Sequence, residues 1–338
     1  MTVHQIAPRR TDLHQQGDPA PRRPRPTRVF AHRGASAEFP EHTRAAYLRA
    51  IESGADGLEI DVHLTADGQL VCFHDFTVER TSDGTGPVAE KTLAQMRALD
   101  VCSWKTPQLA KTPRFWRSRK LADTYGAPDE QVMTLPEVLK LLADAGRPMG
   151  LAIELKHPSP YGSRLEDEVL KVLLEAGWDP ETSTVPGAPR PGGGVHLIDV
   201  SFMSFHPGAL IHLAEMVPAE RLCSLFDLVN DRSIARQMAK MQFSFGMRPF
   251  VAAVLRGTAK DAEALVWNHR AGIAGPGLKY VRQRPAEVKA WIARGSVLRV
   301  WTVDKPKDVD LLLGLGVAEI TTNRPAQVRE QVSAVRGE

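Results

Sequence analysis

Short apolar runs alternate with amphipathic stretches along most of the chain. We interpret as buried strands the apolar runs at residues 29–31, 57–63, 70–74, 149–155, 197–202, 222–226, 272–278, 297–303 and 319–322. Helical spacing of apolar positions occurs at residues 43–53, 135–145, 165–176, 207–216, 261–267, 285–293 and 306–315. Such alternation predicts parallel strands joined by crossover helices. About eight such units in about 300 residues favour a (β/α)8 TIM barrel, with an open doubly wound sheet as the alternative.

Three stretches depart from this alternation. Residues 1–27 are rich in proline and arginine, so we expect a disordered basic tail there. The barrel is then expected to span residues 28–330, with a short C-terminal tail at 331–338. Residues 80–133 follow the second strand and a D-G hairpin signal, and we interpret them as an insertion packed over one end of the barrel. Residues 182–195 contain P-G-A-P-R-P-G-G-G, which predicts a flexible loop.

Composition and charge narrow the class of protein. A formal net charge of +3 over 338 residues does not indicate nucleic acid binding. The scattered thiols of Cys72, Cys102 and Cys223 predict buried cysteines, because neither a disulfide framework nor a zinc spacing is present. The sequence has no run of ~20 apolar residues and no secretory signal, so we expect a cytoplasmic protein. Membrane contact through the tail or the insertion, and the oligomeric state, stay open.

Polar side chains gather where the predicted strands end. They are His32 and Arg33 after the first strand, Glu59 and Asp61 in the second, His74 after the next apolar run, Glu154 and Lys156 near residue 150, and Trp301 near residue 300. In a parallel barrel the carboxyl ends of all strands meet at one mouth, where active sites lie. Residues that are far apart in the sequence are therefore expected to share one pocket.

The acidic residues of this group have the spacing of a metal site. Glu59 and Asp61 are two residues apart on a strand, so both side chains point to the same face. Two close carboxylates repel each other unless a cation lies between them. Glu154 offers a third oxygen ligand, and an all-oxygen set favours Mg²⁺ or Ca²⁺. The alternative is that the carboxylates are simply paired with Arg33 or Lys156.

The basic residues at the same mouth suit acid–base and phosphate chemistry. His32 and His74 would titrate near neutral pH and could act as base and acid in one reaction. Arg33 and Lys156 suit a phosphoryl group, although they could equally balance the charge of the carboxylates. We interpret the remaining histidines of the predicted barrel that lack an evident partner as structural or surface residues, namely His157, His196, His206, His212 and His269.

Ordered motifs give the sequence a family resemblance. F-A-H-R-G-A-S, P-E-H-T, G-A-D-G-L-E-I-D-V-H-L-T-A-D-G and H-D-F-T-V-E-R-T-S-D-G-T-G occupy the first third, and L-A-I-E-L-K, V-S-F-M-S-F, R-V-W-T-V-D and I-T-T-N-R-P follow. Together they resemble the glycerophosphodiester phosphodiesterases from Val29 to Pro325, with few matches between Phe226 and Val297.

The resemblance implies a specific chemistry. It implies a TIM barrel that hydrolyses small glycerophosphodiesters to glycerol 3-phosphate and an alcohol. It implies one divalent cation on Glu59, Asp61 and Glu154, and an acid–base pair of His32 and His74. We hypothesise attack by the glycerol 2-hydroxyl on its own phosphorus, followed by opening of the cyclic phosphate by water.

The resemblance also raises points on which this chain differs. Glu41 is implied at the site as a metal ligand or a close neighbour. From their positions at strand ends, we also expect Arg33, Lys156 and Trp301 to bind the substrate or its phosphate. His42 stands where the family usually has asparagine, and an imidazole there could turn outward or alter the surroundings of the site. The insertion around residues 105–131 is longer and more basic than expected, which leaves the preferred alcohol open.

Two other functions remain as alternatives at this stage. A phospholipase D-like lyase acting on lysophospholipids would use the same histidines and carboxylates but release a cyclic phosphate lipid. A non-catalytic barrel that binds phosphodiesters would lack one of the key groups, and none is missing from the sequence.

Overall fold

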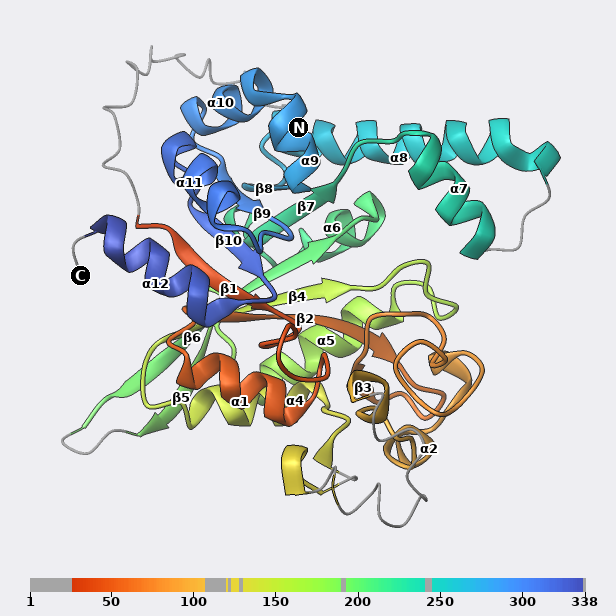
Figure 1. The fold of residues 1–338 in the computed structure, drawn as a ribbon, viewed down its shortest axis with the longest axis vertical. Helices are drawn as coiled ribbons and strands as arrows, with labels where there is room; N and C mark the ends of the chain where they lie inside the picture. The colour runs from red at the N-terminus through yellow and green to blue at the C-terminus, as the bar shows by residue number, and fades with distance from the viewer. Residues whose placement is uncertain are drawn as a thin grey trace, which may run out of the picture.

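The computed structural model describes residues 26–106, 120, 123–127, 130–189, 193–240 and 245–336. Eight parallel strands form a closed barrel with helices around it, which confirms the predicted fold (Figure 1). The barrel closes because the first strand pairs with both the second and the last. The barrel strands are β1 (Arg28–His32), β2 (Gly57–Leu64), β4 (Met149–Leu155), β6 (Val195–Ser204), β7 (Leu222–Phe226), β8 (Ile273–Pro276), β9 (Val297–Val300) and β10 (Glu319–Thr322).

Two further strands are antiparallel additions to the barrel. β3 (Leu70–Cys72) pairs with the end of β2, as the hairpin signal predicted. β5 (Thr184–Pro189) pairs with β6. The prediction of a flexible loop over residues 182–195 is therefore wrong for the residues of β5, while residues 190–192 lie outside the described part of the chain.

Helices cover the outside of the barrel. Their bounds are α1 (Arg44–Glu52), α2 (Leu93–Arg97), α4 (Leu135–Ala143), α5 (Arg164–Glu175), α6 (Pro207–Leu213), α7 (Asp231–Lys240), α8 (Arg248–Trp267), α9 (Leu278–Gln283), α10 (Pro285–Ala293), α11 (Pro306–Leu315) and α12 (Pro325–Arg336), with 3-10 turns at η1 (Val88–Glu90), η2 (Ser103–Lys105), η5 (Ala219–Arg221) and η6 (Phe245–Met247). Among the described residues, no helix combines the length and apolarity that crossing a membrane requires.

The chain ends differ from the prediction at the C-terminal side. α12 continues to Arg336, so residues 331–336 form part of a helix and the predicted C-terminal tail is wrong there. Val328 and Val332 of this helix are buried, which explains why it docks on the barrel. Residues 1–25 of the predicted disordered tail lie outside the described residues.

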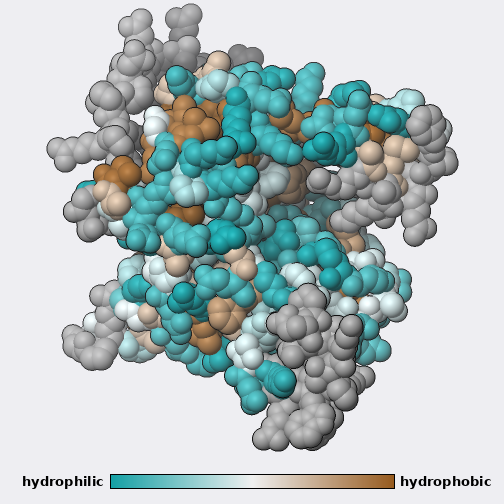
Figure 2. All heavy atoms as spheres, in the orientation of Figure 1, coloured by the Kyte–Doolittle hydropathy of each residue, from teal (hydrophilic) through white to brown (hydrophobic). Residues whose placement is uncertain are grey.

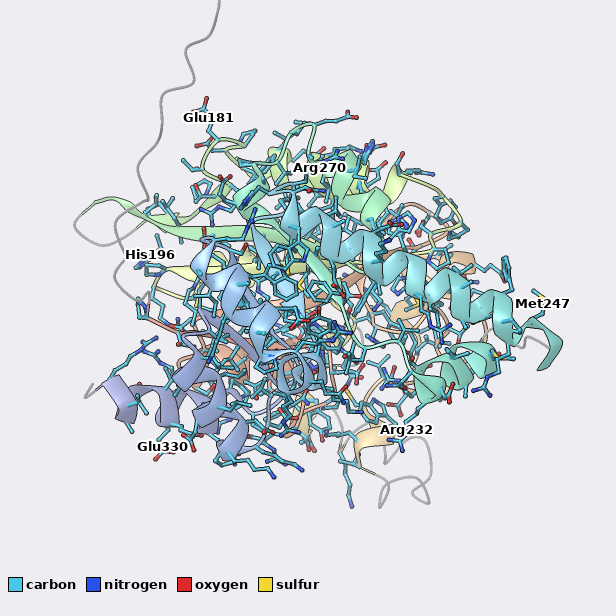
Figure 3. All side chains as sticks on the ribbon, turned by 90° about the horizontal axis from the view of Figure 1, so that it is seen from above. Glu181, His196, Arg232, Met247, Arg270 and Glu330 are labelled. Carbon is cyan, nitrogen blue, oxygen red and sulfur yellow. The ribbon has the colours of Figure 1, made fainter. Side chains whose placement is uncertain are left out.

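α7 and α8 form a pair that extends beyond the barrel. α8 has 20 residues, which corresponds to a length of about 30 Å. Figure 3 shows the two helices side by side, with Arg232 on α7 and Met247 at the outer end of α8. The predicted helix at residues 261–267 is only the inner end of α8, the part that packs on the barrel through Ala262, Leu265 and Val266.

The barrel interior is filled below its mouth. Phe30, Met203, Leu225 and Ile273 belong to one buried cluster. The guanidinium of Arg299 lies 4.5 Å from the ring centroid of Phe30, and its Nε donates to Glu319 at 2.7 Å. Because these side chains fill the lower barrel, a ligand can reach the inward-facing residues above them only from the carboxyl ends of the strands.

The described part of the predicted insertion has a small core of its own. Val78, Val88, Met96 and Val101 are buried together with residues of β3 and with Cys102. This core lies next to the mouth and fixes the segment that follows β3. The three cysteines are all buried with free thiols, as predicted.

Candidate active site at the barrel mouth

Strand register brings the predicted polar residues together. The pairing of β1 with β2 places His32 opposite Glu59, and the pairing of β2 with β4 places Asp61 opposite Glu154. His74 reaches the same place because the backbone amide of Phe73 donates to the Asp61 carbonyl at 3.0 Å. Residues from four separate motifs therefore meet above the end of β2.

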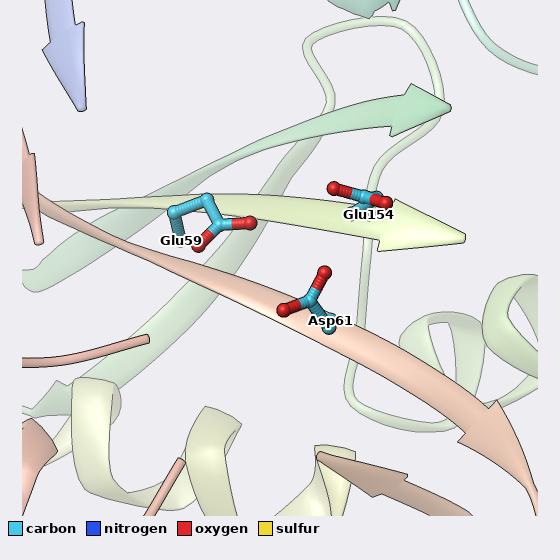
Figure 4. A group of neighbouring side chains, drawn as sticks. All are labelled: Glu59, Asp61 and Glu154. Atoms are coloured by element: carbon cyan, nitrogen blue, oxygen red, sulfur yellow. The ribbon is translucent and has the colours of Figure 1, made fainter. Parts of the chain in front are cut away.

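The three predicted carboxylates form a compact group. Glu59, Asp61 and Glu154 are all buried, and each offers an oxygen within 4.8 Å of those of the other two. Figure 4 shows their carboxylates turned toward one another from β2 and β4. Such an all-oxygen cluster could hold a hard divalent cation.

The electrostatics of this group depend on both burial and repulsion. Burial, together with the nearby charges of Asp61 and Glu154, raises the pKa of Glu59 well above its ordinary value. Burial also raises the pKa of Glu154 to about 7, against the opposing effect of Lys156. The pKa of Asp61 is lowered, because Lys156 and Arg33 outweigh the effect of burial. Burial and mutual repulsion therefore disfavour negative charge on Glu59 and Glu154, whereas the neighbouring cations favour it on Asp61.

Two cations border the carboxylates. Lys156 Nζ donates to Glu154 at 2.7 Å and lies 3.2 Å from Asp61 Oδ1. Arg33 Nε lies 3.1 Å from Asp61 Oδ2, and the Arg33 backbone amide donates to Glu59 Oε2 at 3.1 Å. Although burial opposes the lysine charge, Asp61 and Glu154 hold the pKa of Lys156 above its usual value. The alternative raised from the sequence, that Arg33 and Lys156 pair with the carboxylates, thus agrees with the contacts in the structure.

His32 is held as a neutral imidazole with one free nitrogen. Its Nδ1 lies 2.7 Å from the side-chain oxygen of Asn323, which accepts and so fixes the proton on Nδ1. Asn323 is itself oriented by Asp304, to which its amide nitrogen donates at 2.7 Å. Burial and the nearby Arg33 lower the pKa of His32 to about 3. Because Nδ1 carries the proton, the lone pair of the neutral ring is on Nε2.

His74 has a different partner. Its Nδ1 donates to Asp75 Oδ1 at 2.6 Å. Burial lowers the pKa of His74, but Asp61 and Asp75 oppose that effect. A carboxylate stabilises imidazolium better than an amide does. Of the two histidines at the mouth, His74 is thus better suited to carry a proton.

Glu41 does not lie among the three carboxylates. Its carboxylate accepts from Arg33 at 2.9 Å and from Arg80 at 2.6 and 3.0 Å. Arg80 also pairs with Asp75, so these ion pairs connect His74 to Arg33. The structure thus makes Glu41 a close neighbour of the site that holds two guanidinium groups in place.

A cavity of about 400 Å³ opens above these residues. His32, Arg33, Glu59, His74 and Glu154 all line it. Figure 2 shows the surface hollowed between the part around α8 and the part around β2 and β4. The volume is within the range of small-molecule sites. Among the predicted site residues, Trp301 also lines this pocket, whereas Asp61, Lys156 and Glu41 do not.

Comparison with known protein families identifies the family to which this site belongs. The family model of the glycerophosphoryl diester phosphodiesterases matches residues 32–327, which includes every residue of the mouth described above. The chain belongs to this family. It is an enzyme, a hydrolase of phosphodiesters.

Individual relatives agree with the family match. A Mycobacterium tuberculosis protein named "Probable glycerophosphodiester phosphodiesterase 1" is 32% identical over 301 residues, covering 89% of this chain and 90% of the relative. The glycerophosphodiester phosphodiesterase of Caldanaerobacter subterraneus is 27% identical, with 88% and 95% covered.

Solved structures share the fold. An Oleispira antarctica phosphodiesterase in complex with the product sn-glycerol-3-phosphate gives a TM-score of 0.60 at 22% identity, covering 90% of this chain and 96% of that one. A glycerophosphodiester phosphodiesterase from Agrobacterium tumefaciens gives 0.55 at 24% identity, with 90% and 99% covered.

Trp301 lines the cavity but not as a hydrogen-bond donor. Its indole Nε1 donates to the Gly275 carbonyl at 2.8 Å. That N–H is therefore already paired with the backbone, and the prediction that Trp301 contacts the substrate stays a prediction. The ring instead meets Phe205 edge to face at a centroid distance of 5.3 Å and forms an apolar wall.

His42, which the resemblance places at a position expected to hold asparagine, turns inward. Its Nε2 donates to Asp61 Oδ2 at 2.8 Å, and its Nδ1 accepts from the Tyr47 hydroxyl at 2.8 Å. The residue has a φ of +62°, a conformation that asparagine also tolerates. Burial lowers the pKa of His42, so it bridges the helix α1 and the carboxylate as a neutral ring.

We expect His42→Phe to lower the free energy of unfolding by about 1–3 kcal/mol, because it removes the buried hydrogen bonds of the ring to the Tyr47 hydroxyl and to Asp61 Oδ2. His42→Asn should cost less, because asparagine keeps a polar group and accepts the positive φ. Urea denaturation of both variants measures the difference. Equal stability of the phenylalanine variant and the wild type would show that this bridge contributes nothing.

Other histidines have partners that the sequence did not reveal. His157 Nε2 lies 2.6 Å from Glu166, and His212 Nε2 lies 2.7 Å from Asp167. His206 stacks on His157 at a centroid distance of 4.9 Å. None of the three lines the cavity. The interpretation as structural or surface residues agrees with these positions.

Sequence reasoning missed three residues that orient the site: Asp75, Arg80 and Asn323. Asp75 directly follows His74, so the adjacent carboxylate was a usable signal for an oriented imidazole. Asn323 follows the last strand and lies 291 positions from His32. Only the closure of the barrel brings that pair together.

Proposed function

We propose that the protein hydrolyses glycerophosphodiesters to glycerol 3-phosphate and an alcohol, with one divalent cation held by Glu59, Asp61 and Glu154. The observation that carries the proposal is the register of β1, β2 and β4, which groups these carboxylates below the cavity that Glu59 and Glu154 line together with His32 and His74. The names of the relatives, and the product in the Oleispira antarctica structure, support the same substrate class.

The residues present fit a cation. Asp61 Oδ1 is buried and accepts no hydrogen bond from the described residues, although Lys156 Nζ is nearby. Burial and, to a smaller extent, the neighbouring carboxylate charges raise the pKa values of Glu59 and Glu154, and a bound cation would oppose both effects. Carboxylate oxygens alone favour Mg²⁺ or Ca²⁺ over zinc. When bound, the cation supplies positive charge that favours ionisation of the attacking hydroxyl and offsets charge on the phosphoryl oxygens.

His32 acts as the first base in this proposal. Its free Nε2 takes the proton of the glycerol 2-hydroxyl, whose oxygen forms a bond to phosphorus. His74, protonated and supported by Asp75, gives its proton to the oxygen of the departing alcohol as that P–O bond breaks. The products of this step are the free alcohol and a five-membered cyclic phosphate.

Water then opens the ring with the roles reversed. His74 takes a proton from the attacking water, and His32 returns its proton to the 2-oxygen as the bond from that oxygen to phosphorus breaks. Glycerol 3-phosphate leaves, and both histidines regain their starting states. Arg33 and Lys156 lie beside the carboxylates and stabilise negative charge on the phosphorane, which is usually the largest effect in such reactions.

Product analysis tests this function. Purified protein with Mg²⁺ or Ca²⁺ should release glycerol 3-phosphate from at least one of glycerophosphocholine, -ethanolamine, -inositol and -glycerol, as followed by ³¹P NMR. Accumulation of a cyclic phosphate as the end product would favour the lyase instead. No turnover of any of the four would contradict the proposed substrate class.

A further inference from the structure

Two hollows of opposite charge meet at the reaction centre. The cavity described above has one cation and three carboxylates in its lining, namely Arg33, Glu59, Glu154 and Asp227. A second hollow of about 420 Å³ shares His32 and Arg33 with this cavity. Its charged lining residues are four cations and two carboxylates, namely Arg33, Arg80, Lys105, Arg324, Glu41 and Asp304. This second hollow, which we call the basic hollow, therefore has a net positive charge.

Both carboxylates of the basic hollow already have partners. Glu41 accepts hydrogen bonds from two arginine side chains, as described above. Asp304 Oδ2 accepts from the side-chain amide of Asn323 at 2.7 Å, and its Oδ1 accepts from the Asn323 backbone amide at 2.8 Å. Among the residues that the structure describes, no ion pair joins either carboxylate to Lys105 or Arg324. These two cations therefore lack a carboxylate partner.

Lys105 is fixed in the basic hollow with donors to spare. Its Nζ donates to the Ser36 carbonyl at 2.7 Å and lies 5.5 Å from the ring centroid of Trp104. An ammonium group has three N–H donors, so the bond to Ser36 leaves the others for a further acceptor. Burial lowers the pKa of Lys105, against the effect of Glu41, and the neighbouring charge of Arg324 lowers it further. A bound anion would oppose both burial and this repulsion.

Arg324 offers a fork of donors directly before α12. Its backbone is held in place because its amide nitrogen donates to Thr322 Oγ1 at 3.0 Å. Its side chain is exposed, and within the described part of the chain no hydrogen bond or ion pair engages its guanidinium. Lys105 and Arg324 can therefore bind one anionic group together, the lysine as a point charge and the arginine through parallel N–H donors.

The charge of the basic hollow distinguishes the two halves of a glycerophosphodiester. The glycerol half is uncharged and the same in all these substrates, so unpaired cations add nothing to its recognition. The alcohol half varies and can carry a second negative charge. Only the alcohol half therefore gains from two cations that have no carboxylate partner in the protein.

We propose that the basic hollow is an anion-binding subsite, and that the preferred substrates are glycerophosphodiesters whose alcohol carries a phosphate or carboxylate group held by Lys105 and Arg324. This inference rests on the proposed function of the same site. The chemical steps do not change. The P–O bond to the alcohol breaks as His74 donates its proton, the alcohol departs with its anionic group, and water opens the cyclic phosphate to glycerol 3-phosphate. Cationic alcohols such as choline are disfavoured, because they would approach two like charges.

A matched pair of substrates tests the proposal. The 3-hydroxypropyl and 3-phosphonooxypropyl esters of glycerol 3-phosphate differ only in the terminal phosphate. At saturating Mg²⁺ and about 50 mM NaCl, we expect kcat/KM to be at least about tenfold higher for the phosphorylated ester, because it forms two additional ion pairs in a partly exposed hollow. The ratio should fall toward one at about 500 mM NaCl, because salt screens such pairs.

Two results of this comparison would count against the subsite. Equal or lower kcat/KM for the phosphorylated ester, or a ratio that salt does not change, would overturn the subsite and leave the proposed function intact. Turnover of neither ester, nor of glycerophosphocholine, would overturn the proposed function as well.

Charge-removing variants locate the subsite. Arg324→Gln and Lys105→Gln should each lower the ratio of phosphonooxypropyl to hydroxypropyl kcat/KM about fivefold, because each removes one ion pair. Arg324→Lys keeps the charge and should retain most of the ratio. The control is Arg270→Gln, at an exposed arginine that precedes β8 and so lies at the amino ends of the strands, away from the mouth. A ratio unchanged in both charge-removing variants, or lowered as much in the control, would overturn the assignment to Lys105 and Arg324.

Discussion

Replacing His74 with alanine is expected to lower kcat/KM for glycerophosphocholine by roughly 10³-fold, and His32→Ala should have an effect of similar size. Each histidine transfers a proton in both proposed steps, and each is held by a dedicated partner, Asp75 or Asn323. Because neither histidine belongs to the carboxylate cluster, binding of Mg²⁺ or Ca²⁺, measured by calorimetry, should survive both replacements.

The two histidines can be told apart by the leaving group. With a glycerophosphodiester of p-nitrophenol, whose departing oxygen needs no proton, His74→Ala should recover most of its cyclisation rate, whereas His32→Ala should not. His269→Ala, a histidine outside the cavity, is the control and should behave like the wild type. Recovery in the His32 variant instead would reverse the assigned roles, and wild-type activity in either variant would remove that histidine from the mechanism.

Replacing Glu59 with glutamine is expected to weaken divalent cation binding by at least about 100-fold, because even groups that only support a ligand contribute 10–100-fold. Activity should fall accordingly and return in part at high cation concentration. Full chelation by EDTA should abolish wild-type activity, and added Mg²⁺ or Ca²⁺ should restore it. Glu330→Gln, at an exposed glutamate of α12, is the matched control. Turnover that persists after full chelation would refute the metal-dependent reaction.

The same cluster predicts a pH effect on stability. Burial and like charges raise the pKa of Glu154 in the folded protein from 4.5 to about 7, and raise that of Glu59 as well. The folded state of the cation-free protein thus binds more protons than the unfolded state in this range. Its free energy of unfolding should be highest below pH 4.5, as far as these groups contribute, and fall as the pH rises through about 7.

Thermal unfolding with EDTA and with saturating Mg²⁺ checks this expectation. A bound cation should remove the decrease in stability at high pH. Glu59→Gln should also reduce it, because the amide carries no charge. If the cation-free wild type and the cation-free variant are each equally stable at pH 5 and pH 8, these carboxylates do not repel each other as described.

The barrel and its site could be predicted because they follow from local patterns. Buried parallel strands appear as continuous apolar runs, and the polar residue that ends each run marks the mouth. Glu59 and Asp61 were placed on one face by strand alternation alone. Contacts between side chains that are distant in the sequence could not be predicted from such local patterns. The pairing of Glu41 with Arg80 depends on two loops that meet only in the folded protein.

The regions that the sequence did not predict are those that extend beyond the barrel. α8 is exposed on more than one side for most of its length, so its apolar residues do not form the single stripe by which a packed helix is recognised. Gly257 within it further weakens the helical signal. β5 contains two prolines and pairs with β6 alone, so its composition resembles a loop.

The distance along the chain between His32 and Asn323 has a consequence for synthesis and refolding. The first strand cannot acquire its second neighbour, nor His32 its orienting amide, until the last strand has been made and has paired. A ribosome-bound chain that lacks β10 would therefore contain all three carboxylates and both histidines and still be inactive. During refolding, the return of turnover should lag behind compaction and helix formation, and thereby report the moment when the two ends of the sheet join.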